Sequence, residues 1–148
     1  MKVIIAKDSN KVGMKGAAEI INLLKVKKDA VLGLATGGTA ETVYPHLIKS
    51  YNKKEIDFKK VKTINLDEYK GLDGKNEQSY RYFMDKNLFE HVNIEKKNTF
   101  VPKGIGDKEK NLKEFNDKIN KNPRDLQLLG VGANGHIAFN EPNDFLHS

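Results

Sequence analysis

The sequence predicts an α/β fold, in which an open, mostly parallel sheet of Rossmann-like type has helices on both faces. Short apolar, β-branched segments alternate with segments of helical periodicity along the whole chain, and parallel strands need such crossover helices. No internal repeat or low-complexity linker interrupts this order. We therefore expect one domain, residues 1–148.

Five segments have the composition of strands: 2–6, 30–35, 61–66, 98–102 and 126–130. The apolar runs at 30–35 and 126–129 are typical of strands that are covered on both faces. Few residues follow the last strand, so little remains to cover it. We therefore expect the domain to be incomplete at its C-terminus.

Four helices are expected from apolar residues that recur at helical spacing. The first follows a cap at Asp8 or Ser9, the second covers 41–51, the third begins after Ser79, and the fourth covers 107–120.

The composition favours a small anionic ligand over a nucleic acid or a membrane. The net charge is +6, but the lysines are spread over many segments and form no concentrated patch. No apolar run approaches the length of a membrane span. The chain has no cysteine, which excludes disulfides and fits a cytoplasmic protein. No histidine and carboxylate set has metal-ligand spacing, so we predict no metal and no cofactor.

A glycine turn, Thr36-Gly37-Gly38-Thr39, follows the segment 30–35. Glycines between a strand and a helix expose backbone N–H groups, and the helix dipole adds partial positive charge, so the turn suits a phosphate. The threonine hydroxyls can add hydrogen bonds. The turn has neither the Walker sequence nor the dinucleotide fingerprint. The alternative is a plain strand–helix turn capped by Thr39.

Two adjacent carboxylates, Asp67 and Glu68, follow the segment 61–66. Side chains alternate at a strand end, so one carboxylate should face the cleft and the other the flank. If partly desolvated, Asp67 has the chemistry of a general base for a carbon acid. The alternative is a turn or helix cap, which is the commoner role of a lone aspartate.

The stretch 130–142 contains three glycines around a single histidine, directly after an apolar segment. Glycines let the backbone turn tightly and approach a ligand closely. His136 can exchange protons near neutral pH, and a carboxylate such as Glu141 can fix its tautomer and raise its basicity. The alternative is a glycine-rich surface loop with a solvated histidine.

Taken together, the three loops resemble those of the glucosamine-6-phosphate deaminase family, whose members are also called glucosamine-6-phosphate isomerases. The resemblance extends over essentially the whole chain and is strongest at 32–39, 65–72 and 130–142. The related 6-phosphogluconolactonases share the fold and the phosphate turn, but their second motif resembles Asp-Glu-Arg and their third lacks Phe-Asn-Glu-Pro. This chain has Tyr69 after the two carboxylates and Phe-Asn-Glu-Pro at 139–142, so it resembles the deaminases.

The resemblance implies conversion of glucosamine 6-phosphate and water to fructose 6-phosphate and ammonia, in amino-sugar catabolism. Asp67 would be the base that moves the C2 proton, and His136 would open the pyranose ring. Glu141 would orient and charge-balance His136. Asn134, at a position where many members have aspartate, would belong to the same set; it can hydrogen-bond but carries no negative charge.

The same resemblance implies a sugar-phosphate substrate and its contacts. Residues 36–39 would hold the phosphate, and Glu68, Gly132, Asp67 and His136 would contact the substrate. Family members continue well past Pro142, into further strands, a lid and basic phosphate ligands. We therefore expect an N-terminal portion that does not turn over substrate alone.

Two other functions remain open at this level. The chain can be a non-catalytic sugar-phosphate-binding module, a use made of related folds in transcriptional regulators, or a 6-phosphogluconolactonase-like hydrolase. The sequence also leaves open whether copies of the chain associate into a homo-oligomer.

Overall fold

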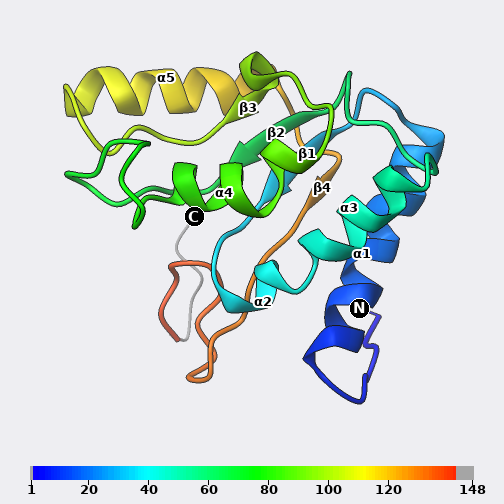
Figure 1. The fold of residues 1–148 in the computed structure, drawn as a ribbon. Helices are drawn as coiled ribbons and strands as arrows, with labels where there is room; N and C mark the ends of the chain where they lie inside the picture. The colour runs from blue at the N-terminus through cyan, green and yellow to red at the C-terminus, as the bar shows by residue number, and fades with distance from the viewer. Residues whose placement is uncertain (1, 143–148) are drawn as a thin grey trace.

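A four-stranded parallel sheet forms the centre of residues 2–142, the part of the chain that the computed structural model describes (Figure 1). Its strands are β1 (Val31–Leu34), β2 (Lys62–Asn65), β3 (Thr99–Phe100) and β4 (Leu126–Gln127), in the order β3-β2-β1-β4. The chain adds β2 and β3 on one side of β1, and β4 then pairs on the other. This reversal creates a topological switch point between β1 and β4, where open α/β sheets bind ligands. The predicted fold class is confirmed.

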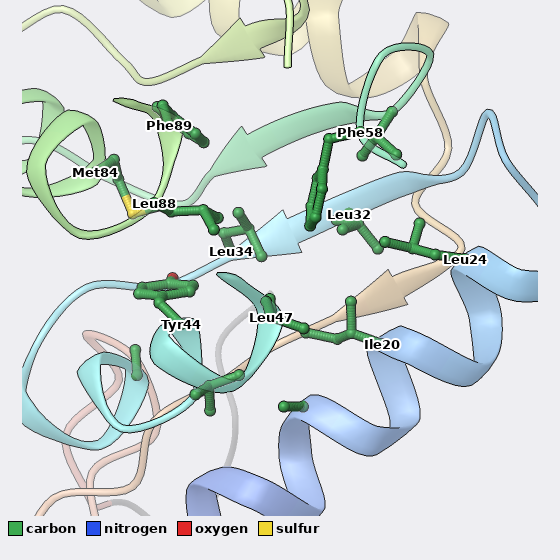
Figure 2. Packing of buried hydrophobic residues seen from close by; sticks show 14 of the residues in the cluster. Ile20, Leu24, Leu32, Leu34, Tyr44, Leu47, Phe58, Met84, Leu88 and Phe89 are labelled. Carbon is green, nitrogen blue, oxygen red and sulfur yellow. The ribbon is translucent and has the colours of Figure 1, made fainter. Parts of the chain in front are cut away.

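One face of the sheet packs against α1 (Ser9–Val26), α3 (Tyr44–Asn52) and α4 (Tyr80–Asn87). Figure 2 shows Leu32 and Leu34 of β1 among Ile20 of α1, Leu47 of α3 and Met84 of α4. All five side chains are buried almost completely. Because each contributes roughly 1.5–3 kcal/mol when buried, this face supplies most of the apolar stabilisation of the fold.

Helix α5 (Lys108–Lys121) lies against the opposite face. The ring of Phe115 stacks on Phe100 of β3, with 6.1 Å between the ring centroids. The preceding residue, Thr99, points to the other face of the sheet, where its hydroxyl accepts a hydrogen bond from Arg81 of α4. Helices therefore cover both faces, as predicted. Within residues 2–142, none of the helices combines the length and the apolar character that crossing a bilayer requires.

The strand expected at residues 2–6 is wrong. The segment is not paired with any described strand, and Val3 and Ile5 are 72% and 94% exposed. β-Branched residues favour an extended backbone, but a strand is stabilised by its neighbours. The last strand is also shorter than expected and Leu129 is largely exposed, because β4 is at the edge of the described sheet with only β1 beside it.

The helix expected at 41–51 is interrupted. A single turn, α2 (Gly38–Glu41), follows the glycines, and α3 begins at Tyr44 with Pro45 in its first turn. Proline has no N–H to donate, so it fits a first turn, whose N–H groups have no partner within the helix. The glycine turn thus leads into only one helical turn, which has a small dipole. Two 3-10 turns, η1 (Phe89–His91) and η2 (Lys96–Asn98), connect α4 to β3.

A buried tyrosine fixes the end of β1. Tyr44 is completely buried, and its hydroxyl donates a hydrogen bond to the carbonyl of Ala35. Burial raises the pKa of Tyr44, so the phenol keeps its proton and remains a donor. Ala35 directly precedes Thr36, and the start of the glycine turn is therefore tied to α3.

We expect Tyr44→Phe to destabilise the fold by about 1–3 kcal/mol, because the buried carbonyl of Ala35 loses its donor. The midpoint of urea unfolding, followed by circular dichroism, measures this change. Tyr51→Phe is the matched control on the same helix, since Tyr51 is only partly buried; its effect should be within about 0.5 kcal/mol. Equal losses in both variants would contradict an anchoring role for the Tyr44 hydroxyl.

Candidate active site

The loops that follow β1, β2 and β4 meet in one pocket of about 260 Å³ at the switch point. Parallel strands end at the same edge of a sheet, so three loops that are far apart in the chain become neighbours. Seven predicted site residues line this pocket: Thr36, Gly37, Gly38, Thr39, Asp67, Gly132 and His136. The three others, Glu68, Asn134 and Glu141, are not among the residues that line it.

The glycine turn forms an open part of the pocket wall. Gly37 has a φ of 92°, in the left-handed region that glycine adopts without steric cost. A Cβ atom at Gly37 or Gly38 would meet nothing within 4 Å, so the backbone is accessible to a ligand. Because α2 is a single turn, an anion here would be held by backbone N–H groups and threonine hydroxyls more than by a helix dipole.

Asp67 points into the pocket in an environment that suits a general base. Burial, the larger cause, and the negative charge of Glu68 raise the pKa of Asp67 to about 6. Such a carboxylate is mostly ionised at neutral pH, yet it holds a proton more strongly than an ordinary aspartate. It can therefore accept a proton from a weak acid in the pocket.

Glu68 is turned to the flank, as the alternation of side chains predicts for one of the two carboxylates. Its oxygens accept hydrogen bonds from the backbone N–H groups of Tyr69, Tyr80 and Arg81. It does not line the pocket. Backbone donors therefore engage the carboxylate of Glu68, and contact between Glu68 and substrate stays a prediction.

His136 is the first member of a hydrogen-bonded chain. Its Nδ1 lies 2.6 Å from Oδ1 of Asn134, and Nδ2 of Asn134 donates to Oε2 of Glu141 at 3.1 Å. A carboxylate only accepts, so the amide presents its NH2 group to Glu141 and its oxygen to His136. Neutral His136 then has its proton on Nδ1 and a free lone pair on Nε2. Glu141 orients His136 through Asn134 and does not contact it directly.

Gly132 makes room for the imidazole. Its N–H donates to the carbonyl of His136 at 2.9 Å, and a Cβ at Gly132 would lie 2.0 Å from the ring atom Cε1. Any larger residue would displace the ring. Ala138, two residues further on, has a φ of 56°, a conformation that costs a non-glycine residue about 1 kcal/mol or more. The loop thus holds His136 through the close approach of Gly132 and the hydrogen bond to Asn134.

Tyr80, the first residue of α4, is a pocket residue that the sequence analysis missed. Its ring packs against Tyr69 and Phe139, with 4.7 Å and 6.4 Å between the ring centroids. Burial, and then the neighbouring Tyr69 and Asp67, raise the pKa of Tyr80, so its hydroxyl stays protonated and can donate to a ligand. No motif marks Tyr80; its position after the helix cap Ser79 is the one signal in the sequence.

The pocket therefore combines a glycine turn with an accessible backbone, a carboxylate of raised pKa and a hydrogen-bonded histidine. These features define the class: an α/β domain suited to acid–base chemistry on a small anionic ligand. Within residues 2–142, no group of three or more histidines and carboxylates is arranged to hold a metal ion.

The chain belongs to the family of glucosamine-6-phosphate isomerases and 6-phosphogluconolactonases, because the model of that family matches residues 8–140. The glucosamine-6-phosphate deaminases of Clostridium beijerinckii and Clostridium tetani are each 50% identical to it over 99% of the chain. The chain spans 61% of the length of each of these relatives.

Solved structures give a consistent result. A monomeric glucosamine-6-phosphate deaminase superposes with a TM-score of 0.89 at 37% identity, over 96% of this chain and 60% of that one. The 6-phosphogluconolactonase of Thermotoga maritima has a TM-score of 0.75 at 21% identity, over 92% of this chain and 62% of its own. The second similarity supports the shared fold alone.

Asp67→Asn should stabilise the chain at neutral pH. The folded state raises the pKa of Asp67 from 3.8 to about 6, so it binds this proton more tightly than the unfolded chain. The associated stability is fully present below about pH 4 and is lost as the pH rises through about 6. Above that pH the charged carboxylate costs the fold up to about 3 kcal/mol, and asparagine avoids this cost.

Urea unfolding at about pH 4 and about pH 8 tests this expectation. Asp67→Asn should be more stable than the wild type at the higher pH and nearly equal to it at the lower one. Glu77→Gln, which changes an exposed carboxylate, is the control and should have little effect at either pH. A pH-independent effect of Asp67→Asn would show that Asp67 is not desolvated.

Proposed function

We propose that this chain provides catalytic loops of a glucosamine-6-phosphate deaminase, which converts glucosamine 6-phosphate and water to fructose 6-phosphate and ammonia. The observation on which this depends most is the meeting of Asp67, His136 and the glycine turn in one pocket. The 50% identity to the clostridial deaminases supports the same conclusion. The residue after the two carboxylates is Tyr69, whereas the corresponding lactonase motif resembles Asp-Glu-Arg. This difference favours the deaminase over lactone hydrolysis.

The first proposed step is ring opening. With the phosphate on residues 36–39, Nε2 of His136 takes the proton of the anomeric hydroxyl and returns it to the ring oxygen. Asn134 keeps the proton of neutral His136 on Nδ1, so that Nε2 is free to act as the base. The carboxylate of Glu141 lies one hydrogen bond beyond Asn134, at the end of the same chain.

The second proposed step is proton transfer along the open chain. Asp67 removes the proton from C2 and returns it to C1, and one proton of the amine passes to the former carbonyl oxygen O1. Together these two transfers convert the aldehyde and amine into an alcohol at C1 and an imine at C2. Water then hydrolyses the imine to the ketone and releases ammonia. A carboxylate whose pKa is raised to about 6 is suited to both halves of the transfer, since it accepts and releases a proton near neutral pH.

Substrate assays test the proposal as a whole. This chain, and this chain joined to the C-terminal part of the Clostridium beijerinckii relative, are supplied with glucosamine 6-phosphate, and ammonia release is measured. Proton release from 6-phosphogluconolactone is measured in parallel. For the joined enzyme, ammonia release without lactone hydrolysis supports the deaminase, whereas lactone hydrolysis alone, or binding of the sugar phosphate without either reaction, contradicts it. This chain by itself is expected to release no ammonia.

Asp67→Asn keeps the shape of the side chain and removes the base. In the joined enzyme we expect kcat for ammonia release to fall about 100- to 10,000-fold with little change in KM. Glu77→Gln is the control, because it removes an exposed carboxylate outside the pocket. Retention of wild-type kcat by Asp67→Asn would remove Asp67 from the enolisation step.

His136→Gln should affect ring opening more than the later steps. We expect about 100-fold slower turnover of the cyclic substrate and a much smaller loss with an open-chain analogue that needs no ring opening. Steady-state rates on the two substrates give the ratio. Equal losses on both would mean that His136 acts at some other step.

A further inference from the structure

Glu68 connects two segments that both line the pocket: the loop after β2, with Leu66 and Asp67, and the start of α4, with Tyr80. Its Oε1 accepts hydrogen bonds from the N–H groups of Tyr69 at 2.8 Å and Tyr80 at 2.9 Å, and its Oε2 accepts one from Arg81 at 3.0 Å. A single carboxylate therefore joins the loop after β2 to the first turn of α4. Hydrogen bonds to a charged acceptor are about twice as strong as neutral ones.

These bonds satisfy the start of α4. The first N–H groups of a helix have no partner within it. Glu68 serves the N–H groups of Tyr80 and Arg81, and the hydroxyl of Ser79 accepts from Tyr82 at 3.1 Å. The negative charge at this end also suits the helix dipole. The helix start is thus used to attach the loop and has no donor left for a ligand.

Helix α4 is itself fixed to the sheet. Arg81 bonds both carboxylate oxygens of Asp85, at 3.1 Å and 2.8 Å, and donates to the hydroxyl of Thr99 on β3 at 2.8 Å. Met84, on the same helix, is completely buried in the core. A loop that is attached to α4 through Glu68 is therefore attached to a rigid element.

The loop is held from the β3 side as well. Gly71 donates to the carbonyl of Gly104 at 2.7 Å, and a Cβ at Gly104 would lie only 2.2 Å from the carbonyl oxygen of Tyr69. The loop thus lies between Gly104 and the start of α4. Glu68 connects the loop to that helix start, next to the pocket residues Asp67 and Tyr80.

We propose that Glu68 is a positioning residue: it joins the loop to α4 and so fixes the carboxylate of Asp67 and the ring of Tyr80 in one pocket. The placement follows from the hydrogen bonds alone. The importance of Glu68 for catalysis rests on the proposed function, because positioning Asp67 matters only if a substrate binds in this pocket.

Glu68→Gln tests this placement in the 148-residue chain, with Glu77→Gln as the matched control. Glutamine keeps one acceptor oxygen but sets an NH2 group against an N–H donor. We expect the amides of Tyr80 and Arg81 to exchange about 10- to 100-fold faster with solvent, measured by NMR. The nuclear Overhauser contacts between the Tyr80 and Phe139 rings should weaken, and affinity for glucosamine 6-phosphate, measured by calorimetry, should fall about 10-fold.

A lower urea midpoint with unchanged ring contacts and unchanged affinity would overturn the proposal, because Glu68 would then be a helix cap and nothing more. If Glu68→Gln does not fold, Glu68→Asp takes its place, because it retains the charge on a side chain one methylene shorter. The same ring contacts and the same affinity then decide whether Glu68 positions the pocket residues. Failure of both the wild-type chain and the joined enzyme to bind glucosamine 6-phosphate would overturn the proposed function. The exchange rates and ring contacts would still decide the positioning role, since they need no substrate.

Discussion

The parallel pairing of β1 with β2 and β4 is the constraint on which the whole site depends. Parallel strands end at the same edge of a sheet, so the three loops after them meet there although almost a hundred residues separate the first from the last. The order of the strands reverses at β1, which leaves space between two loops that diverge. The core on the α1, α3 and α4 face fixes β1, and through Tyr44 it also fixes the start of the glycine turn.

Asp67 and Glu68 are adjacent carboxylates, yet their surroundings give them opposite roles. Glu68 is surrounded by backbone N–H donors that stabilise its charge and use its oxygens. Asp67 is partly desolvated beside that charge, and both effects make it hold a proton more tightly. Glu68 thus stabilises the fold, and its neighbour Asp67 suits proton transfer. The two roles differ because the two side chains face different sides of the loop.

At His136, one residue orients the ring and another supplies the negative charge: the neutral amide of Asn134 orients it, and the carboxylate belongs to Glu141. An aspartate there would place a negative charge directly against the imidazole. Asn134 instead fixes which ring nitrogen has the proton, while the carboxylate of Glu141 is one hydrogen bond further away. Orientation needs only a correctly placed acceptor, whereas stabilisation of a protonated ring depends on the distance to the charge.

The sequence by itself determined the alternation of strands and helices, the cap at Ser79 and the positions of the three loops, because these depend on neighbours within a few residues. Only the tertiary structure decided that residues 2–6 form no strand, that backbone donors engage Glu68 and that Tyr80 lines the pocket. A strand needs a partner, and the side of a loop that a residue faces depends on what packs against it. Both are contacts between segments distant in sequence, and no local pattern encodes them.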